Sequence, residues 1–189
     1  MTVIVAVRKG ARAVIAADSA QSDGSMVVPA HFYRDHTKLQ RCGDCWLGSS
    51  GWSATVDALE SIVRGHGAKL DFSSRAATFE SARRIHRLLK DEYFVETQED
   101  KEQPVESSQL DALIVGPAGI FEFESYRSVS EYARYWAIGS GKTLALGAMH
   151  AVYDLLGDPL DIARAGVEAA CELDEGCRLP MEHVRVSLR

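Results

Sequence analysis

The sequence has few cysteines, few prolines and no long apolar run, and it lacks an excess of basic residues. Four cysteines among 189 residues are too few for a disulfide scaffold, and the five prolines form no linker between the two halves of the chain. No stretch of about 18 uninterrupted apolar residues, the length that crosses a membrane, is present. Asp and Glu outnumber Lys and Arg by 27 to 21, which gives a net charge of −6. We therefore expect neither a nucleic-acid partner nor a membrane partner.

The residues that are present are typical of one globular domain. Hydrophobic residues make up 46% and charged residues 25% of the chain, an ordinary mixture for a globular protein. The length fits a single domain that covers residues 1–189. The N-terminal apolar run ends at Arg8 and has no charged leader, so we expect no signal peptide. These features predict a cytoplasmic protein with reduced thiols.

The apolar pattern alternates between strand periods and helix periods. Apolar runs that flank turn signals predict hairpins or strands, and apolar residues at helical spacing predict helices. The predicted hairpins and strands cover residues 3–17, 38–48, 111–124, 135–139 and 182–188. The predicted helices cover residues 52–65, 74–93, 144–157 and 159–176.

The order of these elements decides the fold class. Strands, two helices, strands, two helices and a last strand do not alternate as in a parallel βαβ sheet. This order predicts an α+β fold with antiparallel sheets and helices on their outer faces. A polar, acidic segment over residues 96–108 predicts a loop between the two halves.

Two familiar motifs are incomplete. Residues 139–143 (GSGKT) resemble the end of a phosphate-binding P-loop, but the pattern requires a glycine at the position of Trp136. We therefore interpret the segment as a strand-to-helix turn that remains able to hold an active-site serine. Cys42 and Cys45 have the spacing of a redox or metal pair, yet they flank a predicted hairpin turn instead of beginning a helix. The six histidines show no metal-binding spacing, so we expect no metal and no cofactor.

Thr2 is a candidate nucleophile once Met1 is removed. Threonine is small enough for the initiator methionine to be excised by the ordinary processing enzyme. An N-terminal threonine then carries a hydroxyl and an α-amine, whose reference pKa is about 7.7–8.0. That pKa lies close to working pH, where a general base is most efficient, and threonine activated by its own amine is a recognised nucleophile.

Several segments, taken together and in order, carry a family resemblance. They are residues 2–18 (TVIVAVRKGARAVIAAD), 38–41 (KLQR), 47–54 (LGSSGWSA), 113–123 (LIVGPAGIFEF), 137–142 (AIGSGK) and 169–177 (AACELDEGC). The sequence resembles the proteasome β-subunit/HslV family of N-terminal nucleophile hydrolases over its whole length. It is most similar to the small bacterial members, HslV and the proteasome homologue of β-proteobacteria. The resemblance implies a four-layer α-β-β-α sandwich.

The resemblance also implies roles for individual residues. Thr2 would be the nucleophile, and Asp18 would hold Lys38 charged beside the Thr2 hydroxyl. The backbone N–H of Gly51 would donate to the oxyanion of the tetrahedral intermediate. The residues that would orient the α-amine are Ser140 and Asp174, supported by Cys177.

The sequence departs from the family pattern in two places that bear on function. The segment 21–36 carries an insertion between Asp18 and Lys38. Cys177 stands where the family usually has a serine, and a thiol is the weaker hydrogen-bonding group. We therefore expect the amine-orienting network to be weakened and activity to be low.

Two functions from different classes remain open. The first is a self-compartmentalising threonine endopeptidase that cleaves unfolded polypeptides. The resemblance implies that this endopeptidase forms stacked rings of twelve or fourteen subunits. It also implies a separate ATPase unfoldase if the substrates are folded. The second is a ring-forming assembly of the same fold that retains Met1 and hydrolyses nothing. A third possibility is hydrolysis of small acylamides by the same chemistry, because a fold does not fix the substrate.

Overall fold

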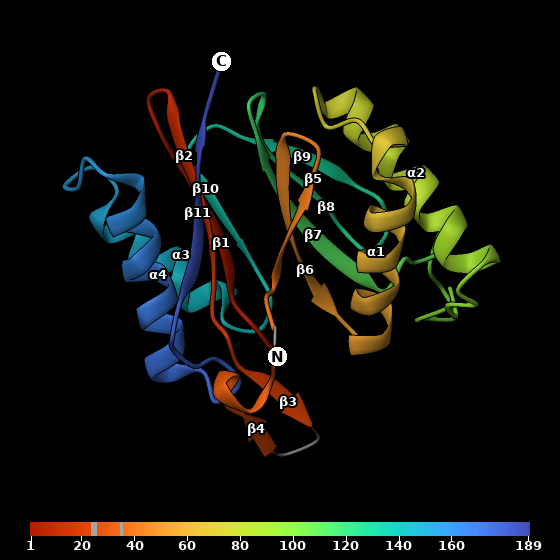
Figure 1. Cartoon of the computed structure of the whole chain (residues 1–189), viewed down its shortest axis with the longest axis horizontal. Coiled ribbons are helices and arrows are strands. Elements are labelled where there is room, and N and C mark those ends of the chain that lie inside the picture. The colour runs from red at the N-terminus through yellow and green to blue at the C-terminus, as the bar shows by residue number, and fades with distance from the viewer. Residues whose placement is uncertain (24–25, 35) are drawn as a thin grey trace.

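Two antiparallel sheets lie between two pairs of helices in the computed structural model (Figure 1). The structure describes residues 1–23, 26–34 and 36–189. Helices α3 (Lys142–Val152) and α4 (Pro159–Leu173) cover the first sheet, and α1 (Ser53–His66) and α2 (Arg75–Asp91) cover the second. The four-layer α-β-β-α, α+β fold expected from the sequence is therefore confirmed.

The first sheet joins the two ends of the chain. Its strands, in spatial order, are β10 (Tyr135–Ile138), β1 (Ile4–Lys9), β2 (Arg12–Ala17) and β11 (Glu182–Ser187). Strands β1 and β2 form the predicted N-terminal hairpin, in which Ile4 pairs with Ala17. Because Ile4 and Ala17 are paired, Thr2 and Asp18 lie at the same end of this hairpin.

The second sheet follows the chain order and is a meander. Its strands are β5 (Leu39–Cys42), β6 (Cys45–Gly51), β7 (Leu110–Gly116), β8 (Gly119–Phe123) and β9 (Val129–Tyr132). The β5–β6 and β7–β8 hairpins turn where the sequence predicted them. Strand β9 was not predicted, because Ser130 and Glu131 interrupt the apolar pattern in its four residues.

The inserted segment 21–36 adds a small element beside the end of the first hairpin. It contains β3 (Gln21–Asp23), β4 (Met26–Val28) and a short 3₁₀ helix η1 (Ala30–Phe32). A second 3₁₀ helix, η2 (Gly67–Lys69), follows α1. Positions 24, 25 and 35 of the predicted insertion lie outside the described residues. Figure 1 shows β3 and β4 below the N-terminus, at the edge of the sandwich.

The alternation of side chains along β1 explains the layered core. Val3, Val5 and Val7 pack against α3 and α4, whereas Ile4 and Ala6 point the other way and fill the space between the two sheets. Successive strand residues point to opposite faces, so this one apolar strand contributes side chains to two hydrophobic cores. A third cluster packs α1 and α2 on the second sheet.

The helix boundaries follow ordinary capping chemistry. The side chain of Asp158 accepts a hydrogen bond from the Leu160 N–H (3.0 Å) and Pro159 begins α4, as predicted. Ser74 caps α2 by accepting from the Ala77 N–H (3.1 Å). The predicted apolar face of α1 was wrong at Trp52, which precedes the helix and is 73% exposed.

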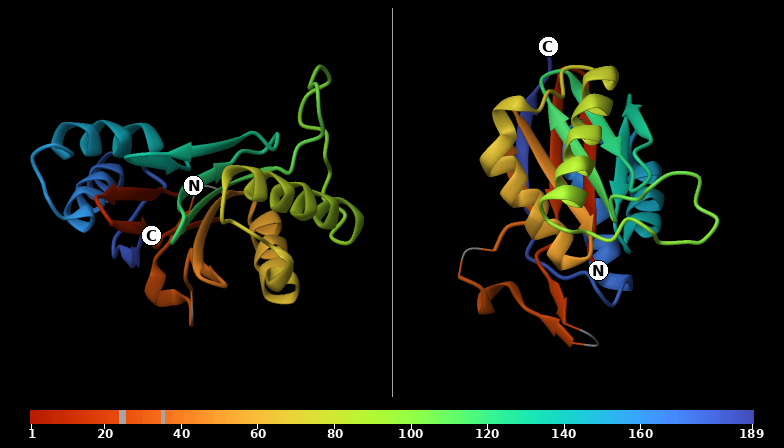
Figure 2. Two further views of the ribbon diagram at one scale, coloured as in Figure 1. Left: turned by 90° about the horizontal axis from the view of Figure 1, so that it is seen from above. Right: turned by 90° about the vertical axis from the view of Figure 1, so that its right-hand side faces the viewer.

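The segment between α2 and β7 has no regular structure, as the acidic composition of residues 96–108 predicted. Figure 2 shows this segment, drawn in green, extending beyond the helical layer. Among the residues that the structure describes, no helix is both long enough and apolar enough to cross a membrane.

Candidate active site

Thr2, Asp18 and Lys38 meet at the end of the first hairpin. Lys38 Nζ donates hydrogen bonds to Thr2 Oγ1 (2.7 Å) and to Asp18 Oδ1 (2.7 Å). The Thr2 hydroxyl in turn lies 2.9 Å from Asp18 Oδ1. Thr2 precedes β1, Asp18 follows β2 and Lys38 precedes β5, so one residue comes from each of three strand ends. The pairing that the sequence resemblance implied is therefore present in the structure.

The Asp18 carboxylate is fully buried and accepts hydrogen bonds at both oxygens. Its donors, besides the Thr2 hydroxyl and the Lys38 ammonium, are the backbone N–H groups of Val3 (3.0 Å), Ala20 (3.1 Å) and Arg178 (3.1 Å). A buried carboxylate is stable only when it is paired and hydrogen-bonded. These hydrogen bonds fix the Asp18 side chain, which in turn orients Lys38.

The backbone around Lys38 is held by a residue that the sequence did not single out. Glu182, the first residue of β11, accepts hydrogen bonds from the Lys38 N–H and the Thr37 hydroxyl. Glu182 belongs to the first sheet and Lys38 leads into the second. This contact fixes the segment before β5 relative to the sheet that carries Thr2.

The turn over residues 139–141 lies against the Thr2 backbone. The Thr2 N–H donates to Ser140 Oγ (3.2 Å), and the Gly141 N–H donates to the Thr2 carbonyl (3.2 Å). Gly139 has φ = +92°, and a Cβ there would lie 2.2 Å from the Thr2 carbonyl oxygen. Only glycine fits this position, so the motif that resembled a P-loop serves to bring Ser140 to the Thr2 nitrogen.

Asp174 extends this contact by one step. The Ser140 hydroxyl donates to Asp174 Oδ1 (3.4 Å), and the same oxygen accepts from the Gly176 N–H (2.8 Å). Thr2 N, Ser140 and Asp174 thus form a continuous hydrogen-bonded chain. These hydrogen bonds fix the orientation of the Thr2 nitrogen.

Cys177 lies behind this chain and is fully buried. A Cβ on Gly141 would lie 3.0 Å from its Sγ, so the thiol fills the space beneath the 139–141 turn. Burial, and then the nearby carboxylates of Asp18 and Asp174, raise the pKa of Cys177 to about 12. The thiol therefore stays neutral at working pH and packs as a small apolar group.

Gly51 and Thr2 line the same cavity, whose volume is about 880 Å³. A Cβ on Gly51 would lie 2.6 Å from the carbonyl oxygen of Gln109, so a larger residue would displace the end of β6. The side chains and backbone that line the cavity come mainly from the inserted segment, β5, β6, α1 and the 139–140 turn. The cavity therefore has room for a ligand beside the Thr2 hydroxyl.

His36 is one of the cavity residues contributed by the insertion. Burial, and then the positive charge of Lys38, lower its pKa below the ordinary 6.5. The imidazole is therefore neutral near pH 7. Its Nδ1 lies 3.4 Å from Gln21 Nε2. This wall of the cavity therefore contributes hydrogen-bonding groups without charge.

Solved structures resemble this chain over its full length. The protein BPH from Thiobacillus denitrificans matches with 33% identity and a TM-score of 0.86, and the alignment covers 99% of this chain and 98% of that one. BPH in complex with epoxomicin matches with 32% identity, a TM-score of 0.86 and 99% coverage of each chain. This chain belongs to the proteasome β-subunit/HslV family. Neither a protein-family model nor a curated protein sequence matches it.

A more distant member of the proteasome β-subunit/HslV family has the same fold. Eukaryotic HslV from Trypanosoma brucei matches with 20% identity and a TM-score of 0.71, covering 98% of this chain and 99% of that one. The fold is therefore a proteasome-type peptidase fold, as the sequence predicted.

The structure brings together the site residues that the family resemblance named. Thr2, Asp18 and Lys38 are in direct contact. Ser140 accepts a hydrogen bond from the Thr2 nitrogen and donates one to Asp174. Gly51 lines the same cavity, and Cys177 lies behind the 139–141 turn. Their catalytic roles stay predictions.

Sequence reasoning missed the groups that hold these residues in place. The backbone donors to Asp18 leave no trace in the sequence, because every residue except proline has an N–H. Glu182 gave no signal either, since a glutamate at the start of an edge strand is ordinary. The arrangement itself, a hydroxyl between a lysine and a buried carboxylate beside an open cavity, is suited to nucleophilic attack.

Proposed function

We propose that the protein is a threonine endopeptidase that uses Thr2 as its nucleophile after Met1 has been removed. The observation that supports this most directly is the contact of Lys38 Nζ with both Thr2 Oγ1 and Asp18 Oδ1, each at 2.7 Å. A positive charge at that distance favours the alkoxide-like form of the hydroxyl. The substrates that we propose are unfolded polypeptides, which can enter the cavity as extended chains.

The proposed reaction follows from the groups around Thr2. The hydroxyl oxygen attacks the substrate carbonyl carbon, and its proton passes to the free α-amine of Thr2. The Gly51 N–H donates to the developing oxyanion, a contribution of about 3 kcal/mol for one such donor. The amine then gives the proton to the leaving nitrogen as the peptide bond breaks, and water releases the acyl group by the reverse sequence. These steps use no metal and no cofactor.

Ser140 and Asp174 have a positioning role in this proposal. Their hydrogen bonds to the Thr2 nitrogen fix its direction. Cys177 takes the place of a serine in the family pattern and contributes a neutral thiol, which is the weaker hydrogen-bonding group. We therefore infer that the enzyme turns over slowly.

The second candidate is an assembly without hydrolytic activity, and it requires that Met1 is retained. Met1 is bonded to the Thr2 nitrogen, and that nitrogen donates its N–H to Ser140. In this form it is an amide and accepts no proton. If Met1 is never removed, the protein keeps its fold but does not hydrolyse peptides.

Hydrolysis of short fluorogenic peptides and of unfolded casein separates the candidates. We expect Met1-free protein to release fluorophore from peptides and fragments from casein, while the Thr2→Ala variant does neither. Cleavage of small acylamides without cleavage of peptides would support the third possibility. No hydrolysis by protein proven to lack Met1 would contradict the endopeptidase proposal.

We further propose that the 189 residues act as one cytoplasmic domain that assembles into two stacked rings of twelve or fourteen subunits in total. An exposed nucleophilic threonine would be hazardous unless it were enclosed, and enclosure requires further copies of the chain. Large apolar side chains on the α3–α4 side, including Leu155 and Leu173, are exposed in the single chain and are available for contacts between copies. Folded substrates would then require a separate ATPase unfoldase.

Light scattering tests the assembly. We expect a mass of twelve or fourteen subunits at micromolar concentration. A stable monomer or dimer would contradict the ring proposal, whatever the outcome of the activity assays.

A further inference from the structure

The two cysteines of residues 42–45 (CGDC) face each other across the β5–β6 hairpin. Cys42 and Cys45 are paired directly in the register of these strands, and both are free thiols. The two-residue turn between them begins at Gly43, which has φ = +58°, a conformation that glycine adopts readily. A tight turn of this kind holds its two flanking residues at a fixed separation.

The backbone spacing of this pair fits a disulfide bond. Directly opposite residues on antiparallel strands have Cα atoms about 4.5–5.5 Å apart and side chains on the same face, and a disulfide joins Cα atoms about 4.4–6.8 Å apart. Cys42 belongs to the core cluster beneath α1 and α2, and Cys45 packs against the same cluster. The two thiols therefore extend to one side of the sheet, and rotation of the side chains is enough to join them.

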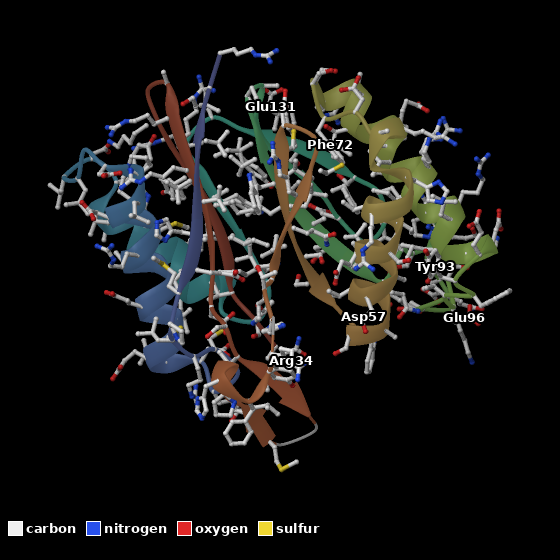
Figure 3. The ribbon with its side chains drawn as sticks, in the orientation of Figure 1. Arg34, Asp57, Phe72, Tyr93, Glu96 and Glu131 are labelled. Atoms are coloured by element: carbon white, nitrogen blue, oxygen red, sulfur yellow. The ribbon has the colours of Figure 1, made fainter. Side chains whose placement is uncertain are left out.

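Both cysteines line a second cavity, which is separate from the one beside Thr2. Its volume is about 360 Å³, and it shares no lining residue with the larger cavity. Figure 3 places Phe72, one of its lining residues, at the end of the molecule opposite Arg34 in the inserted segment. Cys42 is buried, whereas Cys45 is partly exposed. The cavity therefore gives a small molecule access to the Cys45 thiol.

The charges at this cavity favour an uncharged reactant. Asp44 and Asp71 line it together with Arg189, which lies 3.8 Å from the Asp44 carboxylate. Burial, and then the neighbouring Cys42, Asp44 and Asp71, raise the pKa of Cys45 to about 11. Burial also raises the pKa of Cys42. Both thiols are therefore protonated near pH 7, and two carboxylates against one guanidinium disfavour an anionic oxidant.

The same cysteine spacing occurs in metal sites, but the further ligands are not in place. Among the residues that the structure describes, no three side chains of His, Cys, Asp or Glu are grouped so that they could hold a metal ion. Structural zinc sites take four such ligands. The pair is therefore suited to thiol–disulfide chemistry.

We propose that Cys42 and Cys45 are a redox site that forms a reversible disulfide with hydrogen peroxide, a small uncharged oxidant. The Cys45 thiolate attacks one peroxide oxygen, and the O–O bond breaks to give a sulfenic acid and hydroxide. The Cys42 sulfur then displaces the sulfenic oxygen, which leaves as water, and the S–S bond forms. The two thiols lose two electrons and two protons, and the peroxide is reduced to two molecules of water. A dithiol reductant restores both thiols by exchange.

The disulfide would lock the hairpin that carries two of the candidate site residues. Lys38 precedes β5 and Gly51 ends β6, so both lie at the end of the hairpin opposite the turn. In the reduced protein the Cys42 thiol donates to the Gly67 carbonyl (3.7 Å), a weak bond that the disulfide replaces. Disulfides that form in a reducing compartment are usually transient and redox-sensing. The thiol chemistry does not depend on the proposed peptidase function.

Peptide mapping of the full-length protein tests the pair. Reduced protein is treated with hydrogen peroxide, alkylated under denaturing conditions and digested with trypsin, which releases residues 42–64 and residues 165–178 as separate peptides. We expect the first peptide to lose two hydrogen atoms, to resist alkylation and to recover both thiols with dithiothreitol. The second peptide contains Cys171 and Cys177 and is an internal control. It should remain alkylated, because Cys177 is fully buried.

The pH dependence and two variants test the mechanism. The rate of disulfide formation should rise about tenfold for each pH unit from about pH 7 to 9, because the thiolate form of a group with a pKa of about 11 increases in that proportion. The Cys45→Ser variant should form no disulfide in peptide 42–64, and Cys171→Ser should behave as the wild type.

Three results would overturn the inference. They are a wild-type peptide 42–64 that remains fully alkylated after peroxide, equal oxidation of peptides 42–64 and 165–178, and a rate that does not change with pH. Each result is a mass or a rate of thiol oxidation, so none of them bears on the endopeptidase proposal.

Discussion

Protein that has lost Met1 is expected to hydrolyse peptides about 100- to 10,000-fold faster than protein that retains it, the range that a positioned general base contributes. With Met1 in place, the Thr2 nitrogen is an amide that donates to Ser140. Among the residues that the structure describes, the hydroxyl then has only the Asp18 carboxylate within hydrogen-bond reach as an acceptor (2.9 Å). That carboxylate already accepts from Lys38 and from three backbone donors. Removal of Met1 converts the same nitrogen into an amine that accepts the proton.

Two measurements check this expectation together. Intact mass spectrometry of protein from its own cells should show the loss of one methionine. The processed form should gain activity as the pH rises through the pKa of the α-amine, about 7.7–8.0 for an ordinary terminus, because only the neutral amine is a base. Native protein that retains Met1 completely would instead support the assembly without activity.

The sequence predicted Thr2, Asp18 and Lys38 better than it predicted the groups that hold these residues in place. Thr2 was found from the chemistry of an N-terminal threonine and Asp18 from the family resemblance, and the pairing of β1 with β2 fixes their relative position. Lys38 required the family resemblance, because it lies beyond an insertion and a lysine alone carries no signal. The structure places it beside Thr2 through Glu182, a contact between the two sheets that no local pattern encodes.

The elements that were not predicted are short or depend on tertiary contacts. Strands β3, β4 and β9 have three or four residues each and lack the run of four apolar residues that marked β10. The sequence places Phe79 in the predicted helix 74–93, but its burial depends on tertiary contacts, and it is 43% exposed.

Replacement of Lys38 by alanine is expected to reduce kcat/KM at least about 100-fold, the loss typical of removing one preorganised electrostatic group from an active site. Lys38 Nζ is the only positive group that the described residues place within 3 Å of Thr2 Oγ1. Its side chain is only 9% exposed, so water does not replace it easily. Without it, the hydroxyl loses the charge that favours deprotonation.

The Lys38→Ala variant should be less stable than the wild type, because the buried Asp18 carboxylate loses its charged partner. It should still fold, because Asp18 keeps its three backbone donors. Thermal unfolding and light scattering should therefore show a folded protein of the wild-type mass. The Lys69→Ala variant removes an exposed lysine after α1 and should retain full activity. Full turnover in Lys38→Ala would mean that Lys38 does not activate the nucleophile, since the 2.7 Å contact would then have no catalytic consequence. If the alanine variant fails to fold, Lys38→Met, which preserves the volume of the side chain, should give the same loss of activity in a folded protein.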